Sequence, residues 1–203
     1  MEIGRIADLL RPFAELSPDQ LTATSIYIDL LVKWNARVSL TAIRDPDEIV
    51  TRHFGESYFA AKILLPEDWV GNVIDFGSGA GFPGIPLAMF RPKATVTLIE
   101  SNGKKAAFLN EVVGQLGLKN IDLFRGRGES CGRKADLVLM RAVESFDRAL
   151  DVAAGLVQPG GRLCLLIGEN QMTAAKTLEP QLSWSEPIRI PQAHKRILLV
   201  GKL

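Results

Sequence analysis

The sequence has few of the residues that bind metal ions. It contains two cysteines, Cys131 and Cys164, and two histidines, His53 and His194. The cysteines lie far apart in the chain, and none of these residues has the close spacing of a zinc site. We therefore expect no dedicated metal. Two scattered cysteines are also typical of a protein from a reducing compartment.

Long hydrophobic runs and an excess of charge are missing as well. No apolar stretch reaches the roughly 20 residues that would span a bilayer, and the first residues lack the apolar segment of a signal peptide. The formal net charge is +1, so the overall field does not favour nucleic acid. We expect a cytoplasmic, monomeric protein without membrane contact, in which any contact with nucleic acid depends on a local basic patch.

The N-terminal third of the chain is predicted to be helical. Residues 3–13 carry apolar side chains on one helical stripe. A capping box at residues 17–20 predicts the start of a second helix, and residues 45–48 repeat that signal for a third. We expect residues 1–65 to form a helical extension of a domain at residues 66–203.

From residue 66 onward, predicted strands and helices alternate, which is typical of a mostly parallel sheet covered on both faces. The predicted strands are residues 73–76, 94–99, 121–124, 136–140 and 162–167. The predicted helices begin at residue 85 and cover residues 104–116, 146–157 and about 171–182. Two terminal runs, 184–190 and 196–202, have no helix between them and predict an antiparallel hairpin. The fold class is therefore α/β, with a mostly parallel, Rossmann-like sheet and a C-terminal antiparallel hairpin.

The most informative stretch joins the first strand to the next helix, at residues 73–86. Its four glycines are Gly77, Gly79, Gly81 and Gly84. Glycine adopts positive φ without steric cost and lets the main chain approach a ligand closely. A turn of this kind at the carboxyl end of a parallel strand predicts a nucleotide-type binding site.

Two residues in this stretch distinguish between ligands. The spacing of the last three glycines matches the dinucleotide fingerprint, but such a match alone is weak. Asp75 would repel a pyrophosphate, and Pro83 lacks the N–H that could donate to phosphate oxygens. A ligand with a cationic end and no phosphate fits better. This favours S-adenosylmethionine, which carries an ammonium and a sulfonium.

Three further positions at the ends of strands are candidate ligand contacts. Glu100 ends the second strand, where a carboxylate accepts hydrogen bonds from the ribose of an adenosine, although NAD uses an acid at a similar place. Gly128 and Glu129 follow the third strand, where they either read the adenine edge or form a plain polar turn. Arg141 ends the fourth strand. It either clamps a cofactor carboxylate or an RNA phosphate, or pairs with a structural acid.

The whole set of motifs resembles one family, the bacterial 16S ribosomal RNA guanine-N7 methyltransferases, also called glucose-inhibited division protein B. The core of the resemblance is the stretch from Asp75 to Pro86, in which the Pro-Gly-Ile-Pro extension is much more specific than the glycines alone. It is accompanied by Trp34-Asn35, Leu40-Thr41, Asp45-Pro46, Arg52-His53 with Ser57, Glu100-Ser101, Lys104-Lys105, Arg127-x-Glu129 and Met140-Arg141-Ala142. One departure is Ile167, which stands where the family usually has a lysine.

The resemblance implies a class I methyltransferase that uses S-adenosylmethionine and methylates N7 of a guanine in 16S ribosomal RNA, free or in the small subunit. By the resemblance, the cofactor contacts are Gly77, Phe82, Gly128, Glu129 and Arg141, and the glycine-rich stretch and the strand ends considered above add Asp75, Gly79 and Glu100. The candidate RNA-binding residues are Arg52, Lys104, Lys105, Arg127, Lys195 and Arg196. The last two lie in the terminal hairpin, where they are candidates to replace the missing lysine.

This chemistry needs few catalytic groups, because guanine N7 has an exposed lone pair and no proton to lose. Catalysis then depends mainly on alignment, and no residue is predicted to act as acid, base or nucleophile. Three alternatives stay open at this point. They are a small-molecule methyltransferase, an NAD(P)-dependent oxidoreductase and a binding module without activity.

Overall fold

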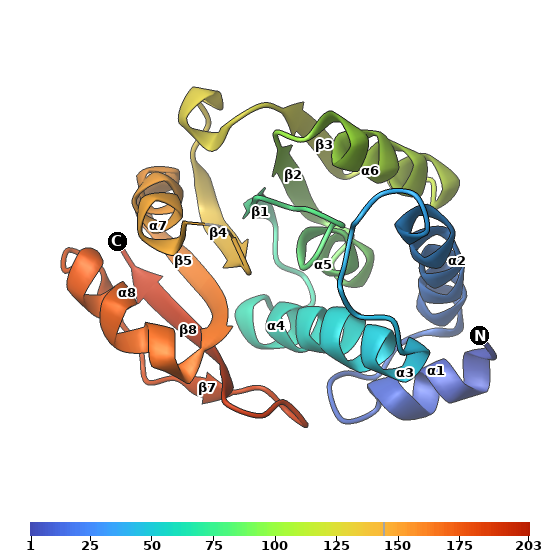
Figure 1. Cartoon of the computed structure of the whole chain (residues 1–203). Coiled ribbons are helices and arrows are strands. Elements are labelled where there is room, and N and C mark those ends of the chain that lie inside the picture. The colour runs from blue at the N-terminus through green and yellow to red at the C-terminus, as the bar shows by residue number, and fades with distance from the viewer. Residues whose placement is uncertain (144) are drawn as a thin grey trace.

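The computed structural model describes residues 1–143 and 145–203 (Figure 1). Its N-terminal part is helical, as predicted, and the capping box is present: Ser17 Oγ accepts from the backbone N–H of Gln20, and Gln20 Oε1 accepts from that of Ser17. One feature was not predicted, a π-helical segment (η1) within the third helical region. The elements are α1 (Ile3–Leu10), α2 (Pro18–Asn35), α3 (Pro46–Glu48), η1 (Ile49–Gly55) and α4 (Glu56–Leu64).

The second part of the chain forms a single mixed sheet in the order β3-β2-β1-β4-β5-β8-β6, with β7 also paired to β8. Strands β1 to β5 are parallel, and β8 runs antiparallel to β5, β6 and β7. The strands are β1 (Gly71–Phe76), β2 (Ala94–Glu100), β3 (Ile121–Arg125), β4 (Ala135–Arg141), β5 (Val157–Gly168), β6 (Ser183–Trp184), β7 (Ile188–Arg189) and β8 (Arg196–Lys202). The predicted fold class is thereby confirmed.

The strand order reverses between β1 and β4, because β2 and β3 extend the sheet on one side of β1 while β4 and β5 extend it on the other. In open α/β sheets, ligands bind outside the carboxyl ends of the strands at such a switch point. The glycine-rich loop after β1 lies there, since β1 ends at Phe76 and α5 begins at Gly84.

The helices between strands mostly follow the sequence. They are α5 (Gly84–Phe90), α6 (Gly103–Gln115), α7 (Phe146–Gly155), α8 (Met172–Leu178) and the short 3₁₀ turns η2 (Gly128–Ser130) and η3 (Glu169–Gln171). Two predicted bounds were wrong. Strand β5 begins at Val157, where a shift in its register against β4 accommodates the turn-forming residues 159–161. The last helix ends at Leu178, not Leu182. Leu182 lies after the helix and is buried in the cluster that includes residues of α7 and α8.

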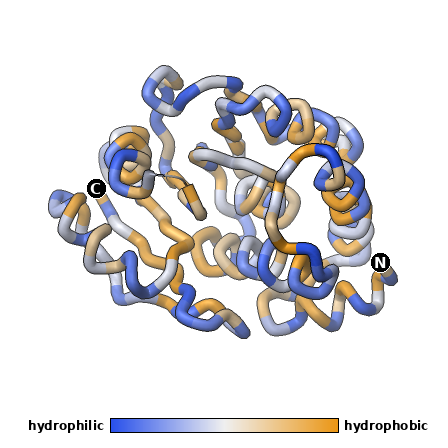
Figure 2. Tube along the Cα trace, viewed as in Figure 1, coloured by the Kyte–Doolittle hydropathy of each residue, from blue (hydrophilic) through white to orange (hydrophobic). Residues whose placement is uncertain are grey.

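Side chains alternate along the strands and divide the core between two faces of the sheet. Val73 and Leu139 belong to the cluster formed with α1, α2, α4, α5 and α6. Their neighbours Ile74 and Met140 belong to the cluster formed with α7 and α8. Figure 2 shows hydrophobic residues along the central strands and on the helix faces that turn toward them. A parallel strand buried on both faces is expected to read as a continuous apolar run, as β4 does.

The N-terminal helices are part of this core. Tyr27 of α2 and Tyr58 of α4 are fully buried in the same cluster as Val73 of β1. Trp34 is partly buried and packs at the edge of the cluster, next to Phe108. Among the helices in the described part of the chain, none combines the length and apolar character that a membrane span requires.

Candidate functional site

Two adjoining hollows lie at the carboxyl ends of the central strands. The first hollow has a volume of about 320 Å³ and is lined by the ends of β1 and β2, the loop after β3 and the start of α7. The second hollow has a volume of about 510 Å³ and is lined by the glycine-rich loop, η1 and the end of β4. Four residues line both hollows, namely Gly77, Glu100, Ser101 and Val143. The two hollows therefore form one continuous groove across the switch point.

The loop after β1 has the backbone conformation that its glycines predict. Gly77, Gly79 and Gly81 have φ values of +69°, +57° and +87°, which favour residues without a Cβ. Gly84 has a different reason to be glycine. An added Cβ there would lie 2.6 Å from Asp75 Oδ2 and from Leu98 Cδ2, so close packing excludes a side chain. Gly77 and Gly79 line the second hollow.

Asp75 is buried below this loop, with 1% of its surface exposed. Its Oδ2 accepts a hydrogen bond from the backbone N–H of Gly84 at 3.1 Å, and it is not among the described residues that line either hollow. Burial raises its pKa to about 7, although hydrogen bonds from Ser78 and Gly84 and the charge of Arg141 act in the opposite direction. In this structure Asp75 braces the loop, and its contact with a ligand stays a prediction.

The raised pKa of Asp75 predicts a pH dependence of stability. Between pH 3.8, its ordinary pKa, and about 7 the folded state holds a proton that the unfolded state has lost. The contribution of Asp75 to the free energy of unfolding therefore falls as pH rises through this window and levels off above it. Asp75→Asn keeps an acceptor for Gly84 but cannot ionise. We expect wild type to lose stability relative to Asp75→Asn between pH 5 and 7 in urea unfolding. Parallel curves for the two proteins would contradict this.

Glu100 lies where the two hollows meet and is itself fixed by the backbone. Its Oε2 accepts from the N–H of Gly79 at 2.9 Å, and its Oε1 accepts from the N–H of Asn102 at 2.7 Å. The carboxylate thus ties β2 to the glycine-rich loop. A carboxylate oxygen can accept a second hydrogen bond, so Glu100 can still accept from a hydroxyl in the groove.

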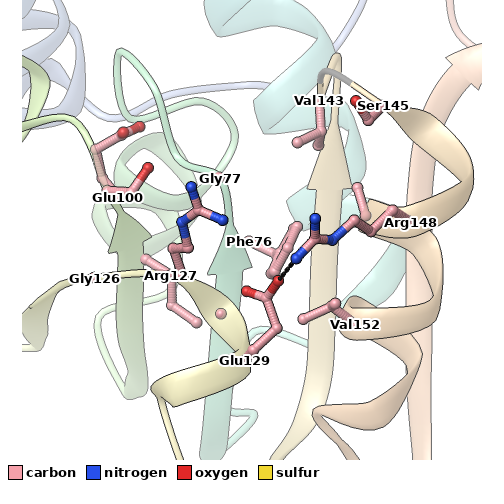
Figure 3. A pocket seen from close by; sticks show the side chains of 14 residues that line it. Phe76, Gly77, Glu100, Gly126, Arg127, Glu129, Val143, Ser145, Arg148 and Val152 are labelled. Carbon is pink, nitrogen blue, oxygen red and sulfur yellow. Dashed lines mark hydrogen bonds and ion pairs between the residues drawn. The ribbon is translucent and has the colours of Figure 1, made fainter.

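The first hollow combines an apolar floor with charged walls (Figure 3). Phe76 and Ile99 line it from β1 and β2. The Arg148 guanidinium donates from α7 to Glu129 Oε1 at 3.0 Å, and the Arg127 side chain lies on the Glu100 side of the hollow. Gly128 is buried against Phe76, where an added Cβ would lie 2.9 Å from the ring carbon Cδ2. Such a slot suits a flat aromatic group with polar edges.

A stack of three rings borders the second hollow. Phe82 lies parallel to Tyr27, with ring centroids 5.3 Å apart, and His53 lies on its other side at 4.8 Å. Phe82 and His53 line the hollow. Burial, followed by the charges of Arg141, Arg52 and Arg196, lowers the pKa of His53 to about 3, so its ring is neutral at physiological pH.

Arg141 meets a structural acid, one of the alternatives that the sequence left open. Its Nη2 lies 3.3 Å from Oε2 of Glu56 and donates to the carbonyl oxygen of Arg52 at 2.6 Å. Burial lowers the pKa of Arg141 to about 10, while Glu56 counteracts this, so the guanidinium stays charged near neutral pH. Arg141 also lines the second hollow. Its contact with the cofactor stays a prediction.

The structure separates the predicted RNA-binding residues into groups. Lys105 lines the second hollow, and Arg127 lines the first. Arg52 and Arg196 both pair with Glu56, and Lys195 lines a separate hollow together with Arg196. Lys104 is exposed at the first turn of α6. Five further basic residues, Arg37, Arg44, Arg125, Arg133 and Lys134, are exposed, and Arg133 pairs with Asp122.

Sequence reasoning missed Glu56 and Thr41. Glu56 is 1% exposed although it is charged, and the signal for it is an acid within an otherwise apolar helical stretch. Thr41 Oγ1 lies 2.7 Å from His53 Nε2. Because the Arg141 guanidinium can only donate to His53 Nδ1, at 3.4 Å, Nε2 carries the proton and donates to Thr41. No group of three His, Cys, Asp or Glu suited to a metal ion occurs within residues 1–143 and 145–203.

Comparison with known proteins agrees with this geometry. The family described as rRNA small subunit methyltransferase G matches residues 20–198. The ribosomal RNA small subunit methyltransferase G of Nitrosomonas europaea is 40% identical over 168 residues, which cover 80% of this chain and 77% of that protein. The protein of the same name from Xanthomonas campestris pv. campestris is 36% identical over 182 residues, which cover 87% of this chain and 84% of that protein. A solved structure, a SAM-dependent methyltransferase from Aquifex aeolicus, superposes with a TM-score of 0.61 at 16% sequence identity. The match covers 81% of this chain and 95% of that chain.

The family match extends from α2 to β8 and includes the residues that line both hollows. The resemblance seen in the sequence is therefore confirmed, as are the methyltransferase fold and the predicted cofactor. The chain belongs to the rRNA small subunit methyltransferase G family, and it is a ribosomal RNA methyltransferase that depends on S-adenosylmethionine.

Proposed function

We propose that the protein methylates N7 of a guanine in the 16S RNA of the small ribosomal subunit, using the groove at the switch point for both cofactor and target base. The observation that carries this proposal is the pairing of two hollows through Glu100 and the glycine-rich loop. One hollow suits an adenosine, and the other lies beside neutral aromatic rings.

The residues of the first hollow fit the adenosine part of S-adenosylmethionine. Phe76 and Ile99 supply an apolar surface for the adenine. Glu100 accepts hydrogen bonds, as a ribose requires. Gly128 and Glu129 lie at the edge of the slot, where their backbone groups can meet the base. Gly77, Gly79, Phe82 and Arg141 then border the amino-acid end in the second hollow. When bound, the cofactor supplies an electrophilic methyl group.

The second hollow fits a nucleophile that loses no proton. Guanine N7 presents a lone pair on an exposed edge of the base, so no residue has to act as a general base. The methylated base gains a positive charge. The free energy of holding this charge in the hollow is therefore lower beside a neutral wall than beside a cationic one. His53 is neutral because its pKa is about 3, and Phe82 beside it carries no charge, so the aromatic side of the hollow is neutral. The task of this chain is to align the reactants and to exclude water.

The N-terminal residues belong to this proposal too. We propose that residues 1–65 extend the methyltransferase domain at residues 66–203 and fold with it as one unit. The shared cluster around Tyr27, Tyr58 and Val73 supports this, and His53 supplies part of the groove wall. We also propose that the protein acts as a monomer in the cytoplasm, where it meets its ribosomal substrate.

Methyl transfer from labelled S-adenosylmethionine tests this function directly. Small ribosomal subunits that lack the modification, and naked 16S RNA, are incubated with the protein, and the RNA is digested to nucleosides for mass spectrometry. We expect label in 7-methylguanosine and none when fully modified subunits are used as the control. Label in another nucleoside would refute the N7 assignment, and label in no RNA would refute the substrate.

A calorimetric titration measures cofactor binding separately from methyl transfer to RNA. We expect S-adenosylmethionine to bind and NAD not to bind. Tight NAD binding would contradict the placement of the adenosine and amino-acid ends of S-adenosylmethionine in the two hollows. Binding of S-adenosylmethionine without transfer to any RNA would instead favour a small-molecule methyltransferase or a binding module.

A further inference from the structure

Three arginines from three separate elements surround one buried carboxylate beside the groove. Arg52 belongs to η1, Arg141 ends β4 and Arg196 begins β8. Their partner is Glu56, the first residue of α4. Arg196 Nε lies 2.9 Å from Glu56 Oε1, Arg52 Nε lies 3.5 Å from the same oxygen, and Arg141 Nη2 lies 3.3 Å from Oε2. We refer to Arg52, Arg141 and Arg196 as the arginine cluster.

The charges in the arginine cluster do not balance. Three guanidiniums face a single carboxylate, which leaves an excess of two positive charges. The neighbouring His53 adds no charge, since it is neutral. Two of the three guanidiniums, those of Arg141 and Arg196, are largely buried against this one carboxylate, and their excess of positive charge is costly unless an anion approaches it. The arrangement is therefore incomplete in electrostatic terms.

Hydrogen-bond donors in the cluster are also left over. Within the described residues, Arg141 Nη1 and Arg196 Nη2 are buried and have no hydrogen-bond partner. The Arg141 side chain is 7% exposed and the Arg196 side chain 19%, so bulk water satisfies these groups poorly. Guanidinium donors in a fixed position match the oxygens of a phosphate group.

The cluster lies between two hollows. Arg141 lines the second hollow, where we place the target base. Arg196 lines a further hollow of about 300 Å³ near the turn between β7 and β8, which is also lined by Arg189, His194 and Lys195 and by one acid, Glu169, that pairs with Arg189. Arg52 is the most exposed member, with 42% of its side chain accessible. A chain of phosphates leaving the groove can therefore pass over Arg52 and Arg196 toward this basic turn.

We propose that the arginine cluster binds a backbone phosphate of the RNA close to the target guanosine, and that Glu56 positions the three guanidiniums for it. The inference rests on the proposed function, because it assumes that RNA enters the second hollow. It assigns to Arg52 and Arg196 a phosphate contact outside the cofactor site. It also explains why a single acid is surrounded by three bases, since the phosphate supplies the missing negative charge.

The test compares Arg52→Gln and Arg196→Gln with Arg11→Gln, which removes the same charge from an exposed site on the far end of α1. Binding to unmodified small subunits is measured over a range of salt concentrations, and S-adenosylmethionine affinity is measured by calorimetry. We expect each cluster variant to bind RNA about tenfold to a hundredfold more weakly. The slope of log affinity against log salt should fall by about one. Cofactor affinity should stay within twofold.

The outcomes separate this inference from the proposed function. If both cluster variants bind RNA with the wild-type salt slope, the inference is wrong while methylation by wild type still stands. If cofactor affinity falls in parallel with RNA binding, the cluster only braces the groove, and the inference is also wrong. In Arg52→Lys the positive charge is present but the two-pronged guanidinium is not. An RNA affinity between those of Arg52→Gln and wild type would therefore support a phosphate contact. Failure of wild type to methylate RNA would refute the function itself.

Discussion

Gly81→Ala is expected to destabilise the folded protein by about 2–4 kcal/mol, because it combines a strained backbone with an overpacked site. Gly81 has a φ of +87°. An added Cβ would lie 2.6 Å from Ile85 Cδ1 and would also clash with Tyr27 Oη. That hydroxyl donates to the carbonyl oxygen of Ala80, so it cannot move without releasing the loop.

The same substitution is expected to slow methyl transfer by up to about a hundredfold, since a displacement of about 1 Å in a positioning loop has effects of this size. The backbone N–H of Gly81 donates to the carbonyl of Ser78 at 2.7 Å, and its carbonyl accepts from Ile85. A shift at Gly81 therefore moves both the loop and the start of α5. Thermal unfolding and single-turnover methylation measure the two effects.

Gly114→Ala is a matched control for Gly81→Ala. Gly114 lies inside α6, and an added Cβ meets nothing within 4 Å. Gly114 is the second-last residue of α6, where alanine is favoured over glycine by less than in a helix interior, so we expect this variant to be more stable than wild type by about 0.5 kcal/mol or less, with normal activity. If Gly81→Ala matched wild type in both stability and rate, the conformation of the loop at Gly81 would not be what positions the cofactor.

The features that were predicted correctly from the sequence depend on neighbouring residues. The capping box joins Ser17 to Gln20, three positions away. The glycines after β1 indicate the positive φ angles that the backbone adopts at those same positions. Apolar runs such as β4 identify strands because both faces are covered. These features depend on residues that are close together in the chain, so they can be predicted from a single sequence.

The orientation of Asp75 was harder to predict, although the strand pattern contains the information. Ile74 and Phe76 face the cluster with α7 and α8, so Asp75 between them faces the side of α5. The sequence interpretation placed its carboxylate toward the ligand, whereas the structure pairs it with Gly84. Alternation along β1 thus decides on which face of the sheet the side chain lies, while a contact of Asp75 with the ligand stays a prediction.

The π-helix η1 and the role of Glu56 could not be predicted locally. Glu56 pairs with Arg141 and Arg196, which lie far along the chain on two different strands. The Arg52 carbonyl accepts from Arg141, so contacts with the sheet fix the helix at this point. Ile167 illustrates the same limit. It is buried opposite Ile197, while Arg196 stands opposite Gly168 and brings a positive charge to the end of β5.

Glu56→Gln is expected to have the largest effect on stability, a loss of about 3–5 kcal/mol in the free energy of unfolding. The amide keeps the shape of the side chain but removes the charge that Arg52, Arg141 and Arg196 share. Two of these guanidinium side chains, those of Arg141 and Arg196, are at least four-fifths buried. Their mutual repulsion would then be uncompensated. Glu186→Gln, at an exposed position, provides the control and should lie within about 0.5 kcal/mol of wild type.

A double-mutant cycle with Arg196→Gln separates this electrostatic cause from lost packing. In wild type, Arg196→Gln removes a favourable pair with Glu56 and should destabilise. In the Glu56→Gln background it removes one of three uncompensated charges, so it should cost less or even stabilise, with a coupling energy of about 0.5–3 kcal/mol. Urea unfolding of the four proteins at one pH measures the cycle. Strict additivity would mean that Glu56 acts through its shape, and the electrostatic argument for a phosphate at the arginine cluster would then lose its basis.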